Sequence, residues 1–141
     1  MTKIEINRLD DAFAFEAKDA NNHSLLMDAA EGIGGHNTGF RPMQTLLAGL
    51  GGCSGVDVVM ILQKQRQAVK GYQMIITGER EEGKEPSLWK KVHIQFIFTG
   101  TVDPEKAEKA CALSIDKYCS VAATLRAAGC EISWEASVIS E

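Results

Sequence analysis

Short runs of alternating hydrophobic and polar residues fill the first 29 positions of the chain. Turn-forming Asp and Asn pairs separate these runs. Alternation at period two is typical of short strands with one apolar face. The pattern therefore predicts a three-stranded meander, whose faces are marked by three apolar pairs: Ile4 and Ile6, Phe13 and Phe15, and Leu25 and Met27.

A glycine-rich segment and then the longest apolar stretch follow the meander. Residues 30–41 contain four glycines and show no periodicity, which predicts a long loop of a kind that often borders a site. Pro42 then opens the stretch PMQTLLAGLGGCSGVDVVMIL, which predicts a helix of about 25 residues. Because this helix is apolar on most sides, we expect a sheet or a second subunit to cover it.

The second half of the chain predicts two strands, a helix pair and a last strand. Residues 69–80 and 89–99 predict a half-buried antiparallel hairpin. An Asp-Pro-Glu sequence starts a helix over about 103–118, a second helical piece covers 120–128, and 130–140 alternates as a strand. The predicted fold class is α+β.

Composition and charge narrow the class of protein. The chain has 141 residues, of which 45% are hydrophobic and 24% charged, as expected for one soluble domain over residues 1–141. A net charge of −4 without a basic run argues against nucleic acid as a partner. The N-terminal residues do not read as an export signal, so we expect a cytoplasmic protein. Gln44, Thr45 and Asp57 interrupt the apolar helix, so we expect no membrane partner.

The four cysteines are Cys53, Cys111, Cys119 and Cys130. In the cytoplasm we expect them to be mostly reduced. Because there is no CxxC pair and no close histidine, the spacing of zinc modules is absent and the sequence predicts no metal site. Cys111 lies on an apolar helical stripe and Cys130 on the inward face of a strand, so both are predicted to be core thiols.

For Cys53 and Cys119 the sequence allows either a structural or a functional role. Cys53 lies between glycines, which either let a helix or ligand approach the thiol or serve tight helix packing. Cys119 lies where the two helical pieces meet, and a helix N-terminus would favour its thiolate. On one continuous helix Cys111 and Cys119 would be about 12 Å apart, beyond disulfide reach, so Cys53 with Cys119 is the pair to test.

Two segments carry a resemblance to a known family. The segment RPMQTLLAGLGGCSGVDVV is similar to the first cysteine motif of the OsmC/Ohr family of thiol-dependent peroxidases, and DKYCSVAATL is similar to the second. The order of elements and the separation of the motifs also agree, so the resemblance spans nearly the whole chain. It implies an α+β protomer that intertwines with its twin as a homodimer, with two central helices at the dimer core and two sites at the subunit interface.

On this resemblance Cys53 is the peroxidatic thiol and Cys119 the resolving thiol. The helix-end argument would instead favour Cys119 as the attacking group. We follow the resemblance, because charges of a partner subunit can outweigh a helix end. The implied reaction needs no cofactor: the Cys53 thiolate reduces an organic hydroperoxide and becomes a sulfenic acid, which condenses with Cys119. A dithiol of lipoyl type would then reduce the disulfide.

Apolar residues around Cys53 suit a fatty or aromatic hydroperoxide. These residues are Leu46, Leu47, Leu50 and Val56.

The sequence departs from the peroxidase pattern at the groups that activate the thiolate. The family's glutamate falls at Met43 or Gln44, neither of which can ionise. Arg41 is the nearest candidate activating cation, and Arg8 is the only arginine among the first 40 residues. The chain thus resembles the less characterised OsmC-like branch.

Three functional hypotheses follow. The first is a peroxidase acting in oxidative stress. The alternative is a non-enzymatic dimer that binds a hydrophobic small molecule or senses redox state, and a third hypothesis is a purely structural stress protein.

Two further residues have both a functional and a structural interpretation. Asp57, one turn after Cys53, would raise the pKa of the thiol if it faced the same pocket, but a solvent-facing or Lys/Arg-paired carboxylate is favoured. His36 in the glycine-rich loop could polarise a site group near neutral pH, but a solvated loop histidine is favoured. His23 and His93 are predicted to be strand-surface residues.

Overall fold

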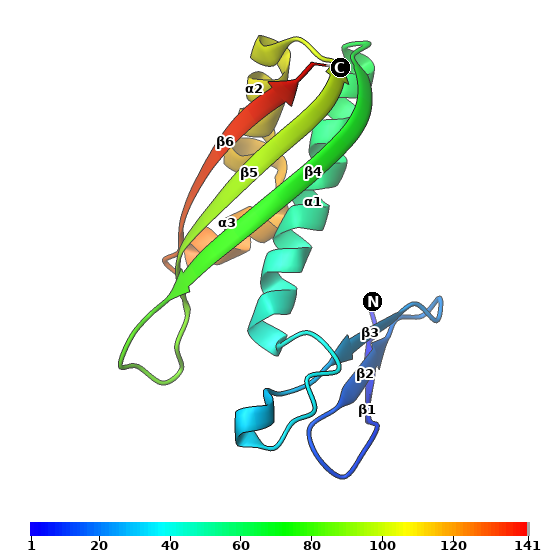
Figure 1. The fold of residues 1–141 in the computed structure, drawn as a ribbon, viewed down its shortest axis with the longest axis vertical. Helices are drawn as coiled ribbons and strands as arrows, with labels where there is room; N and C mark the ends of the chain where they lie inside the picture. Colours follow the sequence, from blue (N-terminus) through cyan, green and yellow to red (C-terminus); the bar gives the residue numbers. More distant parts are fainter. Residues whose placement is uncertain (141) are drawn as a thin grey trace. The chain divides into compact units, whose positions relative to one another are not determined.

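The computed structural model describes residues 1–140 and divides the chain into two compact units. The first unit is Met1–Leu46 and the second begins at Leu47. The described chain contains two three-stranded sheets and three α-helices (Figure 1), which confirms the predicted α+β class and order of elements.

The first unit contains the predicted meander. Strands β1 (Glu5–Arg8), β2 (Phe15–Lys18) and β3 (Ser24–Met27) pair antiparallel in the order β1-β2-β3. Many of its apolar side chains are exposed in the single chain, for example Ile6 at 56% and Phe13 at 46%. The unit therefore has little core of its own.

The loop after β3 folds around the buried carboxylate of Asp28. This carboxylate accepts hydrogen bonds from the backbone N–H groups of Ala29, His36 and Thr38, and from the Thr38 hydroxyl at 2.7 Å. The Thr38 hydroxyl is the largest of the influences that lower the Asp28 pKa to about 2. Asp28 thus organises the predicted long loop, which includes the short 3₁₀ helix η1 (Glu31–Ile33).

Two of the loop glycines are required by close backbone approach. A Cβ at Gly35 would lie 2.1 Å from the carbonyl oxygen of Ala29, and a Cβ at Gly39 would lie 2.6 Å from the backbone of Leu26. Any side chain at either position would collide with main chain. Tight packing of the loop on itself therefore explains these two glycines without a ligand.

The second unit contains a sheet of long strands. Strands β4 (Ala68–Arg80) and β5 (Trp89–Thr101) form the predicted antiparallel hairpin. Strand β6 (Glu131–Ile139) pairs parallel to β5, so the order is β4-β5-β6. In Figure 1 the helices of this unit lie on one face of the sheet.

The helix pair is interrupted by a π-helical turn. Helix α2 (Pro104–Leu113) starts as predicted, with the Asp103 carboxylate accepting the N–H of Glu105 at 2.9 Å. The turn η2 (Ser114–Tyr118) then widens the helix, and helix α3 (Ser120–Ala127) follows. Cys119 between them has extended backbone, with φ −73° and ψ 107°, and is the N-cap of α3.

Helix α1 (Pro42–Lys64) contributes to the hydrophobic core of the second unit. Cys111 and Cys130 are 0% and 5% exposed, which confirms that both are core thiols. Burial raises the pKa of Cys111 to about 12. The largest fully buried apolar residues of this core come from α1, β5 and η2: Leu50, Val58, Leu62, Val92, Ile94, Phe96, Phe98 and Ile115.

The glycines of α1 divide between two faces of the helix. A Cβ at Gly51 would lie 2.9 Å from Cδ1 of Ile76, and a Cβ at Gly55 would lie 2.9 Å from Cε of Met74. These two glycines let β4 pack closely against the helix, which supports the tight-packing interpretation. On the other side, a Cβ at Gly52 would meet no atom of the described residues within 4 Å.

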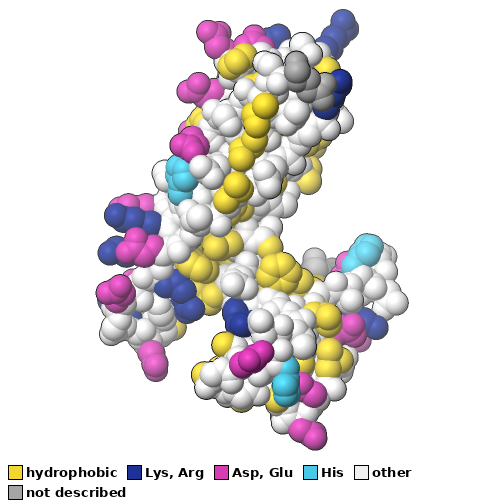
Figure 2. Space-filling model, in the orientation of Figure 1, with side chains coloured by type: hydrophobic (Ala, Val, Ile, Leu, Met, Phe, Trp, Pro, Cys, Tyr) yellow, Lys and Arg dark blue, Asp and Glu magenta, His cyan; other side chains and the backbone are white. Residues whose placement is uncertain are grey.

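An apolar face of α1 remains exposed in the single chain. Val56 is 61% exposed and Met60 is 50% exposed, on the same side as Gly52. Figure 2 shows hydrophobic side chains at the molecular surface as well. By length and composition α1 could span a membrane. Its opposite stripe, however, packs into the core of the second unit with Leu50, Val58 and Leu62.

Candidate functional site

Cys53, Asp57 and Cys119 meet where the middle of α1 packs beside the start of α3. The two sulfurs and a carboxylate oxygen of Asp57 all lie within 4.8 Å of one another. We call these three residues the thiol cluster. A disulfide requires an S–S distance of about 2.05 Å, so a small movement would join the two sulfurs. The pair that the sequence singled out is therefore adjacent in space.

Cys119 is the buried member of the thiol cluster, with 3% exposure. The N–H of Ala122 donates to its sulfur at 3.3 Å, as expected at the N-terminus of a helix. Burial nevertheless raises the pKa of Cys119 to about 11, and the neighbouring Cys53 thiol acts in the same direction. The expectation that the helix end favours a Cys119 thiolate was wrong, because desolvation outweighs the hydrogen bond.

Cys53 is the accessible member of the thiol cluster. It is half-buried, whereas the other three cysteines are buried. It lies one helical turn before Asp57 on α1, so both side chains project toward Cys119. Cys53 is therefore the more accessible of the two thiols to a molecule from solvent.

Asp57 is held by a chain of two buried serines. The Ser114 hydroxyl lies 3.0 Å from Oδ2 of Asp57 and 2.9 Å from the Ser54 hydroxyl. Because an ionised carboxylate can only accept, Ser114 donates to Asp57 and accepts from Ser54. The favoured prediction of a solvent-facing or ion-paired Asp57 was wrong: the carboxylate is half-buried, and its hydrogen-bond partner within the described chain is a serine.

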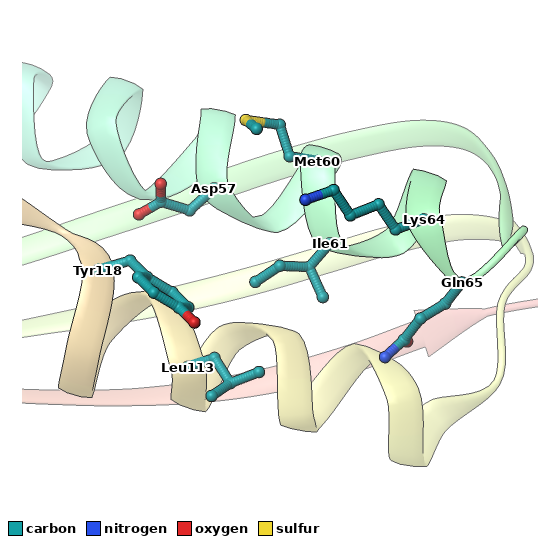
Figure 3. Close-up of a pocket in the computed structure, with 7 residues that line it drawn as sticks. All are labelled: Asp57, Met60, Ile61, Lys64, Gln65, Leu113 and Tyr118. Atoms are coloured by element: carbon teal, nitrogen blue, oxygen red, sulfur yellow. The ribbon is translucent and has the colours of Figure 1, made fainter.

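A cavity of about 550 Å³ opens beside the thiol cluster (Figure 3). Asp57 belongs to both, and the cavity wall is otherwise mainly apolar, with Lys64 and Gln65 adding polar groups. In Figure 3 its residues come from α1, from the segment just after it, and from the α2–η2 region. The lining residues are Asp57, Met60, Ile61, Lys64, Gln65, Leu113 and Tyr118.

The apolar wall of this cavity was not predicted from the sequence. Of the expected neighbours of Cys53, Leu50 is fully buried in the core and Leu47 packs partly buried against it. The signal was nevertheless present, because positions 57, 60, 61 and 64 follow the three- and four-residue spacing of one helix face. Leu113 and Tyr118 have no comparable local signal.

Arg41, the predicted activating cation, belongs to the first unit. Its guanidinium donates to the carbonyl oxygen of Gly39 at 3.2 Å and to the side-chain oxygen of Asn37 at 2.9 Å. The side chain of Gln44 accepts the backbone N–H of Arg41. Arg8 also lies in this unit and donates to the carbonyl of Ala12. A role of either arginine toward the thiols stays a prediction.

The histidines are surface residues. The His36 side chain is 63% exposed, with Nδ1 3.4 Å from the Asp10 carboxylate, as expected of a solvated loop histidine. His23 pairs with Asp19 and is 78% exposed. His93 hydrogen-bonds Ser133 on the neighbouring strand.

Comparisons with known proteins agree with the fold. A family model described as OsmC-like protein matches residues 35–135. Protein YhfA of Escherichia coli (strain K12) is 39% identical over 119 residues, which cover 84% of this chain and 85% of YhfA. A hypothetical protein from Aquifex aeolicus VF5 is 33% identical, with a TM-score of 0.80 and coverage of 99% of this chain and 98% of that chain.

A solved structure described as an organic hydroperoxide resistance protein OsmC, from Legionella pneumophila, shares the fold. Its TM-score is 0.73 at 15% identity, over 97% of this chain and 96% of that chain.

Proposed function

This chain belongs to the OsmC-like family, and on that premise we propose that it is a thiol-dependent peroxidase acting on organic hydroperoxides. The observation that carries the proposal is the adjacency of Cys53 and Cys119, whose sulfurs lie within 4.8 Å. Cys53 acts as the peroxidatic thiol because it is the accessible one, and buried Cys119 acts as the resolving thiol.

The reaction proceeds in three balanced steps. The Cys53 thiolate attacks the distal oxygen of the hydroperoxide, the O–O bond breaks, and the alkoxide leaves as an alcohol after taking a proton. The Cys119 thiol then attacks the sulfenic sulfur of Cys53, which forms the disulfide and releases water. A small dithiol, of lipoyl type, reduces the disulfide by thiol exchange and becomes oxidised itself. The chain's own thiols suffice, without a prosthetic cofactor.

The cavity beside Asp57 supports an organic substrate. Its walls of Met60, Ile61, Leu113 and Tyr118 offer an apolar surface to a fatty or aromatic group. A volume of about 550 Å³ suits a molecule much larger than hydrogen peroxide. We propose that the hydrophobic part of the hydroperoxide lies in this cavity while its peroxide oxygens reach Cys53.

We further propose that the functional unit is a homodimer in the cytoplasm. The exposed apolar face of α1, with Val56 and Met60, would be covered by a second copy of the chain. Small domains with incomplete cores are commonly completed by a second subunit. A reducing compartment would keep the four cysteines as free thiols between catalytic cycles.

The test is turnover of cumene hydroperoxide with a small dithiol as reductant. We expect Cys53→Ser to abolish turnover, and Cys119→Ser to leave a Cys53 sulfenic acid that dimedone traps. Cys130→Ser is the matched control, since Cys130 is a core thiol outside the thiol cluster. Mass spectrometry of peroxide-treated wild type should find a Cys53–Cys119 disulfide. Retained turnover in Cys53→Ser, or absence of that disulfide, would refute the proposal.

A second candidate function is a non-enzymatic dimer that binds an apolar molecule or senses redox state. It is favoured by a negative charge close to the thiols, since a carboxylate oxygen of Asp57 lies within 4.8 Å of both sulfurs. The family's glutamate position falls at Met43 or Gln44, which carry no charge, and this also favours the non-enzymatic hypothesis. Under this hypothesis the disulfide forms with peroxide but multiple turnovers with a dithiol are not seen.

A further inference from the structure

Outside peroxide chemistry, the thiol cluster has the donor set of a site for a thiophilic metal ion. We propose that Cys53, Asp57 and Cys119 bind one Zn²⁺, with the fourth coordination position left for water or another small ligand. Two thiolates and a carboxylate are ligands that zinc uses in proteins. Their donor atoms lie within 4.8 Å of one another, a span that one central ion can bridge with small side-chain adjustments.

The elements that carry the ligands favour a shared ion. Cys53 and Asp57 lie one turn apart on α1, so the helix presents both donors from one face. Cys119 comes from the extended residue between η2 and α3 and supplies the third donor from the opposite side. Three protein donors with one open position are the arrangement of accessible zinc sites, whereas closed structural sites have four.

Two serine hydroxyls already hold the Asp57 carboxylate in place. Ser114 donates to Oδ2 of Asp57 at 3.0 Å, and Ser54 supports Ser114 at 2.9 Å. Such outer hydrogen bonds orient metal-binding carboxylates and contribute to affinity. Both serines are 0% exposed, so this bracing is shielded from water.

The site has an entry path and a place for an exchangeable ligand. Asp57 lines the cavity of about 550 Å³, and the half-buried Cys53 leaves one side of the thiol cluster open. A small anion or water in the cavity can complete the coordination. Each thiol that ligates the ion releases its proton to solvent.

Metal binding and the thiol chemistry exclude each other, because one sulfur cannot be a disulfide partner and a zinc ligand at once. Bound Zn²⁺ would therefore protect the pair from peroxide. Sequence spacing does not reveal such a site, since the two cysteines come from distant segments without a CxxC pair.

The experiment is an anaerobic titration of the full-length, fully reduced chain with Cd²⁺, followed by the ultraviolet sulfur-to-metal charge-transfer band. Zn²⁺ affinity is then measured by competition with a chromophoric chelator. We expect one ion per chain and loss of the band in Cys53→Ser/Cys119→Ser. Ser114→Ala should raise the dissociation constant about 10- to 100-fold, and Asp57→Asn should raise it further.

The matched control is Cys111→Ser/Cys130→Ser, which removes two thiols outside the thiol cluster and should leave the band unchanged. Circular dichroism of each variant establishes that it is folded. A band that persists without Cys53 and Cys119, or no band in wild type with titratable thiols, overturns the proposal. The binding assay contains no peroxide, so its result is independent of the peroxidase test: a chain without turnover can still bind the ion, and an active chain can fail to bind it.

Discussion

The Ser114 hydroxyl lies 3.0 Å from Oδ2 of Asp57, which ties the π-helical turn η2 to helix α1 next to both thiols. Ser114 is the first residue of that turn and is fully buried. Immediately after the turn, the backbone N–H of Cys119 donates to the carbonyl of Ser114 at 2.7 Å. One residue therefore fixes both the carboxylate and the backbone of the second cysteine.

Replacement of Ser114 by alanine should destabilise the protein. The substitution leaves the Asp57 carboxylate and the Ser54 hydroxyl without their shared partner in a buried setting. An unsatisfied buried polar group costs about 1–3 kcal/mol, so we expect a loss of this size in the free energy of unfolding, measured with urea.

Ser120→Ala is the control for this prediction, since Ser120 is exposed at the start of α3. We expect it to change stability by less than about 0.5 kcal/mol. Equal midpoints for Ser114→Ala and Ser120→Ala would show that the buried serine chain contributes nothing to stability.

Alkylation should distinguish Cys53 from the other cysteines. Cys53 is half-buried, whereas Cys111, Cys119 and Cys130 are 0%, 3% and 5% exposed. Burial also raises the pKa of each of these three thiols, so their reactive thiolates are scarce at neutral pH. With limiting iodoacetamide at pH 7, peptide mass spectrometry should find the label first on Cys53. Preferential labelling of Cys130 would contradict the structure, and all four should react in urea.

The sequence predicted most elements because their signals are local. Period-two alternation predicted the strands, and the Asp-Pro-Glu start predicted α2. The π-turn at Ser114–Tyr118 has no such signal, and the sequence predicted one continuous helix there. Likewise, the position of Asp57 depends on Ser114, which is distant along the chain, so the local pattern favoured a solvent-facing carboxylate.

The cysteine pair was reached by two different routes. Elimination among the four thiols and the resemblance both indicated Cys53 with Cys119. The helix-end argument failed for Cys119 because burial depends on the packing of α1, β5 and the helix pair, which no short segment encodes. Long-range packing decides the chemistry of this site, whereas local pattern decides the elements that carry it.

A lysine in place of Val56 should separate the proposed dimer. Val56 is 61% exposed on the apolar face of α1, and a charge there would have to be buried by a second copy. Light scattering after size exclusion should give the mass of two chains for wild type and one for Val56→Lys. Ile139→Lys, at an exposed position at the end of β6, is the control and should stay dimeric. A dimeric Val56→Lys would place the subunit interface elsewhere.

Acid should release the loop that folds around Asp28. The Thr38 hydroxyl, donating at 2.7 Å, is the main cause that lowers the pKa of Asp28 to about 2 from 3.8. Because this pKa is depressed in the folded state, its stabilising contribution is present above about pH 4 and is lost as pH falls toward 2.

Thr38→Val removes the largest of these hydrogen bonds, so the Asp28 pKa should rise toward its ordinary value and the loop should open at higher pH. An NMR titration of the backbone amides at positions 36 and 38 measures the midpoint. Thr101→Val, at an exposed position of β5, should leave that midpoint unchanged. An unshifted midpoint in Thr38→Val would mean that the backbone N–H groups alone hold the carboxylate ionised.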